Sequence, residues 1–171
     1  FSSLLTRIAE MIKIAEKYDR KVIVSGFWMK TNIQIAQHLG YKKKKKGTLI
    51  SIEEMHKYRD DKIMVLSTGA QGEPNASLMK IVNGENRHLE IKSGDTVIFS
   101  ASIVPGNERS VQILKDNLTR QGAKVYTSKL VDVHSTGHAP QEELKAIMKM
   151  IKPNFLIPIH GYYFMRAANA E

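Results

Sequence analysis

The stretch Asp132-Val133-His134-Ser135-Thr136-Gly137-His138-Ala139-Pro140-Gln141-Glu142-Glu143-Leu144 places a histidine-bearing loop directly before an amphipathic segment. A second such loop, Ile157-Pro158-Ile159-His160-Gly161, follows after a helix-length gap. If an apolar strand precedes each loop, both loops emerge at the same edge of a parallel sheet, which is where open α/β folds bind ligands. The stretch therefore predicts an α/β fold that brings His138 and His160 to one site.

The rest of the chain alternates strand-like runs with segments of helical periodicity. Short apolar runs predict strands, and apolar residues spaced three and four apart predict helices. Strands are expected at 21–25, 63–66, 96–99, 125–126 and 154–159, with a strand-like run at 48–50. Helices are expected at about 4–15, 29–39, 75–81, 107–122, 142–151 and 162–170. This alternation indicates βαβ units, so we expect an α/β fold with a mainly parallel sheet flanked by helices.

Length and composition restrict the class of protein. With 171 residues, 42% of them hydrophobic, the chain can bury one ordinary core, or one domain plus a piece of another. The lack of cysteine excludes disulfides and thiolate metal sites, and it fits a cytoplasmic setting. No apolar run approaches the length of about 20 residues that a membrane span needs. The start at Phe1, without an initiator methionine or a signal peptide, suggests a piece of a longer polypeptide with no membrane partner.

The charge of the chain favours a polyanionic partner. Twenty-six Lys and Arg against seventeen Asp and Glu give a formal net charge of +9. Part of the excess is the uninterrupted lysine run Lys42–Lys46. Such a run is more often a solvated loop than a binding site, because like charges repel and extend into water. The chain stays basic without the run, so the preference for a polyanion does not depend on it alone.

Three loops that follow predicted strands carry the polar groups. The loop 67–74 has two glycines that let backbone amides approach a phosphate, but a plain strand-to-helix turn is the more common explanation of a single glycine-rich loop. The loop 100–108 offers hydroxyl groups after the next strand, and the loop 134–138 offers imidazoles before a helix that begins near Pro140. If these loops share one sheet edge, they form a basin of hydroxyls, amides and imidazoles.

The order of four short motifs resembles the β-CASP branch of the metallo-β-lactamase superfamily, and within it the ribonuclease J family. The motifs are Gly-Ala-Gln-Gly-Glu-Pro (69–74), Pro-Gly-Asn-Glu (105–108), His-Ser-Thr-Gly-His (134–138) and Pro-Ile-His-Gly (158–161). The resemblance implies that residues 1–133 are most of a β-CASP domain. It implies that residues 134–171 return into the last strand and helix of a metallo-β-lactamase domain.

The resemblance also implies roles for particular residues. His138 matches a catalytic histidine that acts in proton transfer at the scissile phosphate, and His160 matches a metal ligand that completes a site for two Zn²⁺ ions. The substrate-binding residues implied in this way are Ser2, Ser3, His134, Ser135, Thr136, Gly137 and His138. Without the resemblance, His138 and His160 would be read as residues that cap a loop and pack under a sheet.

The chain departs from the family at several positions. The main metal motif, His-x-His-x-Asp-His, does not occur in it. Leu4, Phe27 and Tyr162 stand where asparagine, arginine and glutamate are usual. Aromatic residues make up 7% of the chain and Trp28 is the single tryptophan, which gives little sign of a platform for base stacking.

The resemblance implies that this chain is part of a zinc-dependent ribonuclease with 5′-exonuclease and endonuclease activity. This piece would supply the groove for single-stranded RNA, be inactive alone, and belong to a homo-oligomer when full length. A second hypothesis is a non-catalytic β-CASP module that binds single-stranded RNA. A third, an unrelated nucleotide-binding α/β domain, is disfavoured by the ordered motifs.

Overall fold

The computed structural model describes residues 4–39, 47–128, 130–131, 133 and 139–170. The chain divides into two compact units, Phe1–His134 and Ser135–Glu171. The first unit contains all the strands of the described residues, and the second contains helices and extended chain.

Two parallel strands form the first sheet of the larger unit. Strand β1 (Lys21–Ser25) pairs with β2 (Ile63–Ser67), which places Ser25 opposite Ser67 at the carboxyl end. The segment 48–50 lies on the other side of β1 through a single parallel bridge between Val22 and Leu49. Two short 3₁₀ helices, η1 (Ile52–Lys57) and η2 (Asp60–Lys62), lead from that segment into β2.

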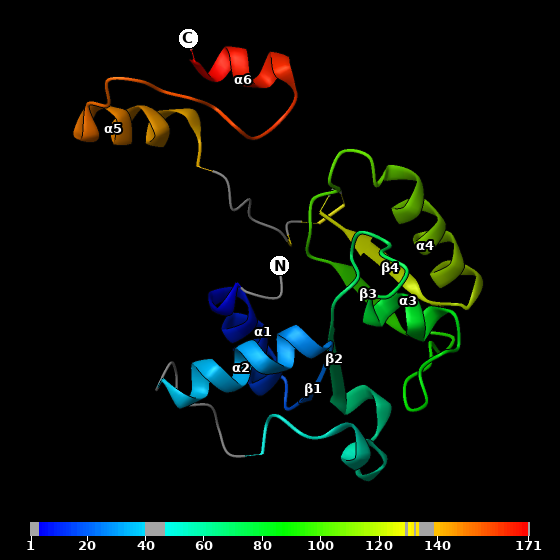
Figure 1. Cartoon of the computed structure of the whole chain (residues 1–171). Helices are drawn as coiled ribbons and strands as arrows, with labels where there is room; N and C mark the ends of the chain where they lie inside the picture. Colours follow the sequence, from blue (N-terminus) through cyan, green and yellow to red (C-terminus); the bar gives the residue numbers. More distant parts are fainter. Residues whose placement is uncertain (1–3, 40–46, 129, 132, 134–138, 171) are drawn as a thin grey trace. The chain divides into compact units, whose positions relative to one another are not determined.

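Helices α1 (Leu5–Lys17) and α2 (Phe27–His38) pack on this sheet (Figure 1). Apolar residues spaced three and four apart give each helix one apolar stripe, and the stripes meet the strands. The resulting core consists of Ile8, Ile12, Ala15, Val22, Met29, Ile33 and Leu66. Burying aliphatic side chains of this size stabilises the fold by about 1.5–3 kcal/mol each.

A second sheet follows in the same unit. Strand β3 (Thr96–Phe99) pairs in parallel with β4 (Lys124–Thr127), and helix α4 (Glu108–Arg120) connects them (Figure 1). The short helix α3 (Ser77–Val82) contacts α4. Their common core consists of Val82, Phe99, Leu114, Leu118 and Ala123.

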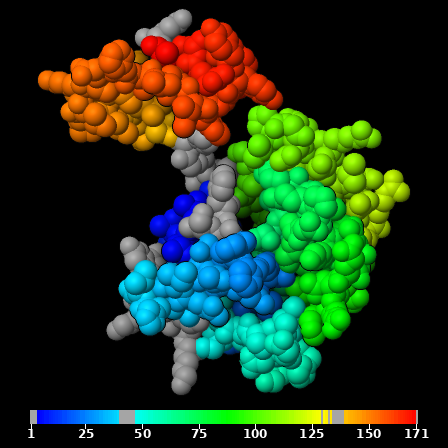
Figure 2. All heavy atoms as spheres, viewed as in Figure 1, coloured from blue at the N-terminus to red at the C-terminus, as the bar shows by residue number. Residues whose placement is uncertain are grey.

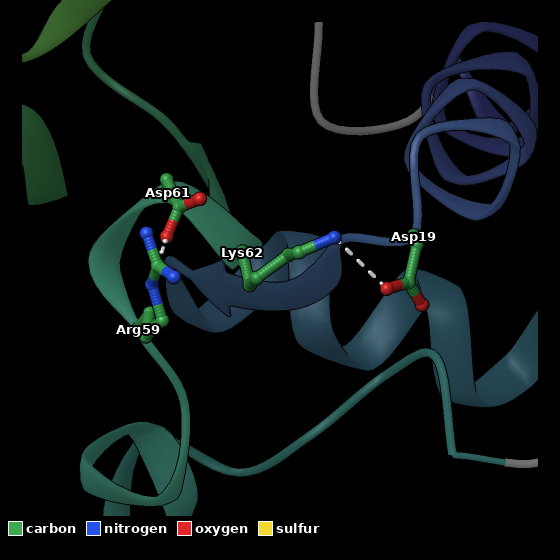
Figure 3. Close-up of polar contacts among 4 residues, drawn as sticks. All are labelled: Asp19, Arg59, Asp61 and Lys62. Atoms are coloured by element: carbon green, nitrogen blue, oxygen red, sulfur yellow. Dashed lines mark hydrogen bonds and ion pairs between the residues drawn. The ribbon is translucent and has the colours of Figure 1, made fainter.

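Polar contacts on the surface connect segments that are distant in sequence. Lys62 Nζ lies 2.9 Å from Asp19 Oδ2, so an ion pair joins the turn after α1 to η2 (Figure 3). A second ion pair joins Arg59 Nε to Asp61 Oδ1 at 3.0 Å, and Figure 3 marks both contacts with dashed lines. All four side chains are exposed, and exposed pairs of this kind contribute little to stability at neutral pH.

The smaller unit differs from the expectation. Its helices are α5 (Gln141–Ile151) and α6 (Tyr163–Ala170), and the predicted strand at 154–159 is absent from the described residues. A strand needs hydrogen bonds to a neighbour, and residues 139–170 contain no neighbouring strand. Phe155, Ile157 and Ile159 are 86%, 78% and 87% exposed, so these apolar side chains are not buried in a core.

The predicted α/β fold with parallel strands flanked by helices is confirmed. Four of the five predicted strands form, and all six predicted helices form within a few residues of their expected ends. The strands make two two-stranded sheets rather than one larger sheet. None of the helices in the described part of the chain combines the length and apolar character needed to cross a bilayer.

Candidate nucleic-acid interface

Most of the site residues predicted from the sequence lie outside the described residues. This applies to Ser2, Ser3 and the loop His134–His138, which includes Ser135, Thr136, Gly137 and the predicted catalytic His138. Their roles therefore stay predictions. The structure does describe the chain on the amino-terminal side of that loop.

Ser100 holds the chain just before the predicted loop. Its hydroxyl donates a hydrogen bond to the carbonyl oxygen of Val133 at 2.6 Å. The carbonyl oxygen of Ser100 accepts a bond from Arg7 Nη1 at 3.1 Å, so α1 is tied to the same point. Ser100 follows β3 directly, and its position after a strand is the only sequence signal that could have singled it out. These contacts hold Val133 next to the carboxyl end of β3.

The loop after β2 forms a turn in which three backbone amides already have acceptors. Thr68 N donates to Ser25 O, Gly72 N donates to Gly69 O, and Gln71 N donates to the carboxylate of Glu73. Amides that already donate within the protein are not available to a phosphate. These hydrogen bonds agree with the strand-to-helix turn, the interpretation that the sequence already favoured.

Gln71 joins this loop to the one after β3. Its Nε2 donates to the carbonyl oxygen of Ser102 at 2.8 Å, and its Oε1 accepts from the amide of Val104 at 2.9 Å. Asn107 Nδ2 lies 3.5 Å from the same oxygen. One amide side chain thus holds two loops at the carboxyl edges of both sheets, a role that the sequence did not reveal.

His160 is the one predicted site residue whose position is described. It is exposed in the smaller unit, between the extended run and Gly161, whose φ is +97°. Within the described residues, no three His, Cys, Asp or Glu side chains are grouped closely enough to hold a metal ion. A catalytic zinc generally takes three protein ligands. The described residues therefore do not amount to a zinc site.

Two aromatic residues at the start of α2 form an exposed pair. The ring centroids of Phe27 and Trp28 are 5.4 Å apart, and the ring planes meet at 79°. The residues are 75% and 68% exposed. Aromatic composition alone suggested no platform for bases, because a count of residues does not show which rings are adjacent and uncovered.

Two models of known protein families match successive parts of the chain. A model described as the beta-CASP domain of Ribonuclease J matches residues 1–118. A model described as the RNA specificity domain of Zn-dependent metallo-hydrolases matches residues 122–170. The two matches together cover both units of the structure.

Individual relatives agree with these matches. The chain is 40% identical over 163 residues to Ribonuclease J of Helicobacter pylori, which covers 95% of this chain and 24% of the relative. It is 37% identical over 171 residues to Ribonuclease J of Synechocystis, an alignment that covers 100% of this chain and 27% of the relative. It is 35% identical over 171 residues to Ribonuclease J2 of Bacillus subtilis, with 100% of this chain and 31% of the relative covered. The chain thus spans less than a third of the length of these curated relatives. Because the β-CASP model covers more than half of it, the chain belongs to the ribonuclease J family.

Proposed function

We propose that this chain is part of a zinc-dependent ribonuclease that hydrolyses RNA phosphodiester bonds as a 5′-exonuclease and endonuclease. The observation that carries the proposal is the succession of the β-CASP match over residues 1–118 and the RNA specificity match over residues 122–170. In this proposal residues 1–133 are β-CASP domain and residues 134–171 belong to the metallo-β-lactamase domain. The part of the enzyme formed by this chain is the groove that binds RNA.

The partner in this proposal is single-stranded RNA held through its phosphates. Ser2, Ser3 and the loop His134–His138 provide the phosphate contacts, and the net charge of +9 attracts the backbone. Two described contacts support the placement of the loop, since Ser100 binds the carbonyl of Val133 and Arg7 binds the carbonyl of Ser100. Both contacts bring the chain before residue 134 to the carboxyl end of β3.

His138 is the proposed proton-transfer residue. An imidazole has an ordinary pKa near 6.5, so it can give a proton to the leaving oxygen near neutral pH. His160 is the proposed zinc ligand of this chain. The remaining ligands of a site for two Zn²⁺ ions would come from outside the described residues, because His160 stands without a ligand cluster among them.

The proposed enzyme is a cytoplasmic homo-oligomer without a membrane partner. The absence of cysteine is consistent with a reducing compartment. Sedimentation analysis of the enzyme and fractionation of cells that produce it test these two statements directly.

Two alanine variants of the complete enzyme test the assignment of residues. His138→Ala should lower single-turnover RNA cleavage by about 10²- to 10⁴-fold, the usual contribution of a general acid or base, with zinc content unchanged. His160→Ala should lower both cleavage and zinc content, because a ligand is lost. Zinc is measured by elemental analysis beside each cleavage assay, and His38→Ala serves as a control far along the sequence from both loops.

The outcomes separate the two hypotheses about function. Equal zinc loss in both variants would contradict the division into proton transfer and coordination. Near-normal RNA cleavage by His138→Ala would indicate that His138 has a structural role and does not transfer a proton. RNA binding without cleavage by the wild-type enzyme would favour the non-catalytic β-CASP module.

A further inference from the structure

The start of α2 carries a pair of exposed aromatic residues. Phe27 and Trp28 are adjacent in sequence, 75% and 68% exposed, and in edge-to-face contact with centroids 5.4 Å apart. In this arrangement the edge of one ring meets the face of the other, so the pair leaves aromatic surface uncovered. Large aromatic side chains that are exposed next to each other form an apolar patch, and such patches often mark binding sites.

The backbone beneath the pair is held firmly. A Cβ atom placed on Gly26 would lie 2.9 Å from Thr68 Oγ1, so the turn from β1 into α2 passes directly against the loop after β2. The Phe27 carbonyl accepts a hydrogen bond from Thr31 Oγ1 at 3.1 Å. Met29, the next residue after the pair, is buried in the core on β1. The rings are therefore presented from an ordered helix end and not from a long loop.

The position and charge of the helix restrict what binds there. The pair follows the carboxyl end of β1, the edge at which α/β folds bind their ligands. Lys30 and His38 are the only ionisable side chains of α2, and the helix carries no acidic residue. In Figure 2 the atoms of α2, in light blue, lie on the surface in view. The exposed rings together with the net charge of +9 favour a partner that combines negative charge with flat apolar faces.

We propose that Phe27 and Trp28 form a stacking platform for the bases of single-stranded RNA. This inference rests on the proposed function, and it adds a contact to bases where that function uses contacts to phosphates. Every base has an aromatic face, so such a platform binds RNA with little regard to sequence. The positive net charge selects the polyanion, and the rings select a nucleic acid whose bases are unpaired.

The tryptophan provides a direct probe, because Trp28 is the only one in the chain. The 171-residue chain is titrated with single-stranded oligoadenylate while the tryptophan emission is recorded. An abasic phosphodiester of the same length carries the same charge without bases. Stacking predicts quenching by oligoadenylate and none by the abasic strand, with tighter binding of the oligoadenylate.

Variants test the energetic contribution of the rings. Phe27→Ala and Trp28→Ala should each weaken oligoadenylate binding by about 5- to 150-fold, the range measured for loss of one stacking side chain, and leave abasic binding unchanged. Trp28→Phe should retain most of the affinity, since an aromatic face remains. Ile35→Ala is the matched control, because Ile35 is an exposed apolar residue of the same helix that is 50% exposed.

Fluorescence anisotropy of labelled strands distinguishes failure of the stacking platform from failure of the proposed RNA-binding function. If the wild-type chain binds neither strand at low salt, the proposed RNA-binding function and the platform both fail. If it binds both strands equally, with unchanged tryptophan emission and no effect of the alanine variants, the platform alone fails and phosphate binding stands. If the alanine variants instead change the sedimentation coefficient and not the RNA affinity, the pair is a protein contact and the proposal is overturned.

Discussion

Replacing Gly72 by alanine tests how closely the loop after β2 approaches α4. Gly72 has a φ of +72°, and a Cβ atom built there lies 2.8 Å from both the carbonyl carbon and the carbonyl oxygen of Ser110. Ser110 belongs to α4, and the residue after it, Val111, is 2% exposed. The obstacle is therefore backbone of a packed helix, which cannot rotate away as a flexible side chain could.

Two physical effects add in this variant. A left-handed conformation costs an alanine about 1–2 kcal/mol relative to glycine. Forcing a methyl group into a filled space costs about 1–3 kcal/mol more. Gly84 is a matched control, since its φ is +73° and a Cβ atom there meets nothing within 4 Å. Gly84→Ala should therefore show the conformational cost alone.

Urea denaturation, monitored by circular dichroism, gives the free energy of unfolding of each of the two variants. Gly72→Ala should be less stable than Gly84→Ala by about 1–3 kcal/mol, with similar slopes against denaturant. Equal destabilisation of the two variants would refute the close approach of the loop to α4. A changed slope for Gly72→Ala alone would mean that the variant alters the denatured state or the two-state transition instead.

Three further predictions concern the core, the surface and the lysine run. Leu114→Ala should destabilise the fold by about 2–5 kcal/mol in urea denaturation, because Leu114 is fully buried, whereas Ile113→Ala on the exposed side should cost far less. The hydrogen bond from Lys62 holds the pKa of Asp19 below its ordinary value of 3.8, so the small stabilisation from this exposed pair is present above that pH and is lost as pH falls through the lowered pKa. The small difference in stability between wild type and Asp19→Asn should therefore shrink from pH 7 to pH 3 in urea denaturation. Neutralising Lys42–Lys46 should reduce the slope of log affinity for single-stranded RNA against log salt by up to about 3.5, and an unchanged slope would mean that the run is only solvated.

Local sequence pattern was sufficient for most of the secondary structure. The run Lys21–Ser25 was predicted as a strand with the bounds that β1 has, and the apolar spacing around Leu114 predicted α4. These elements can be predicted because each buries one face against its neighbours, which requires apolar residues at regular spacing in the sequence. The order of the motifs likewise sufficed to identify the family, because it depends on residue types and spacing alone.

The site was only partly accessible to the same reasoning. The sequence favoured a turn over a phosphate cradle for the glycines of the loop 67–74, and the hydrogen bonds that the amides of Thr68, Gln71 and Gly72 donate within the protein agree with the turn. Spacing cannot decide such a case, since it does not show whether an amide already has an acceptor. The exposure of Phe27 and Trp28 was also invisible, because it depends on what the rest of the fold leaves uncovered.

The sequence by itself determined the helices, four of the strands and the family, because these follow from local periodicity and residue order. Tertiary structure decided what those elements pair with. The strands form two separate two-stranded sheets, and the apolar run at 154–159 stays unpaired in its unit. Strand pairing joins residues that are far apart in the chain, so no local pattern can specify which strands pair. An apolar run also needs a partner that satisfies its hydrogen bonds before it becomes a strand.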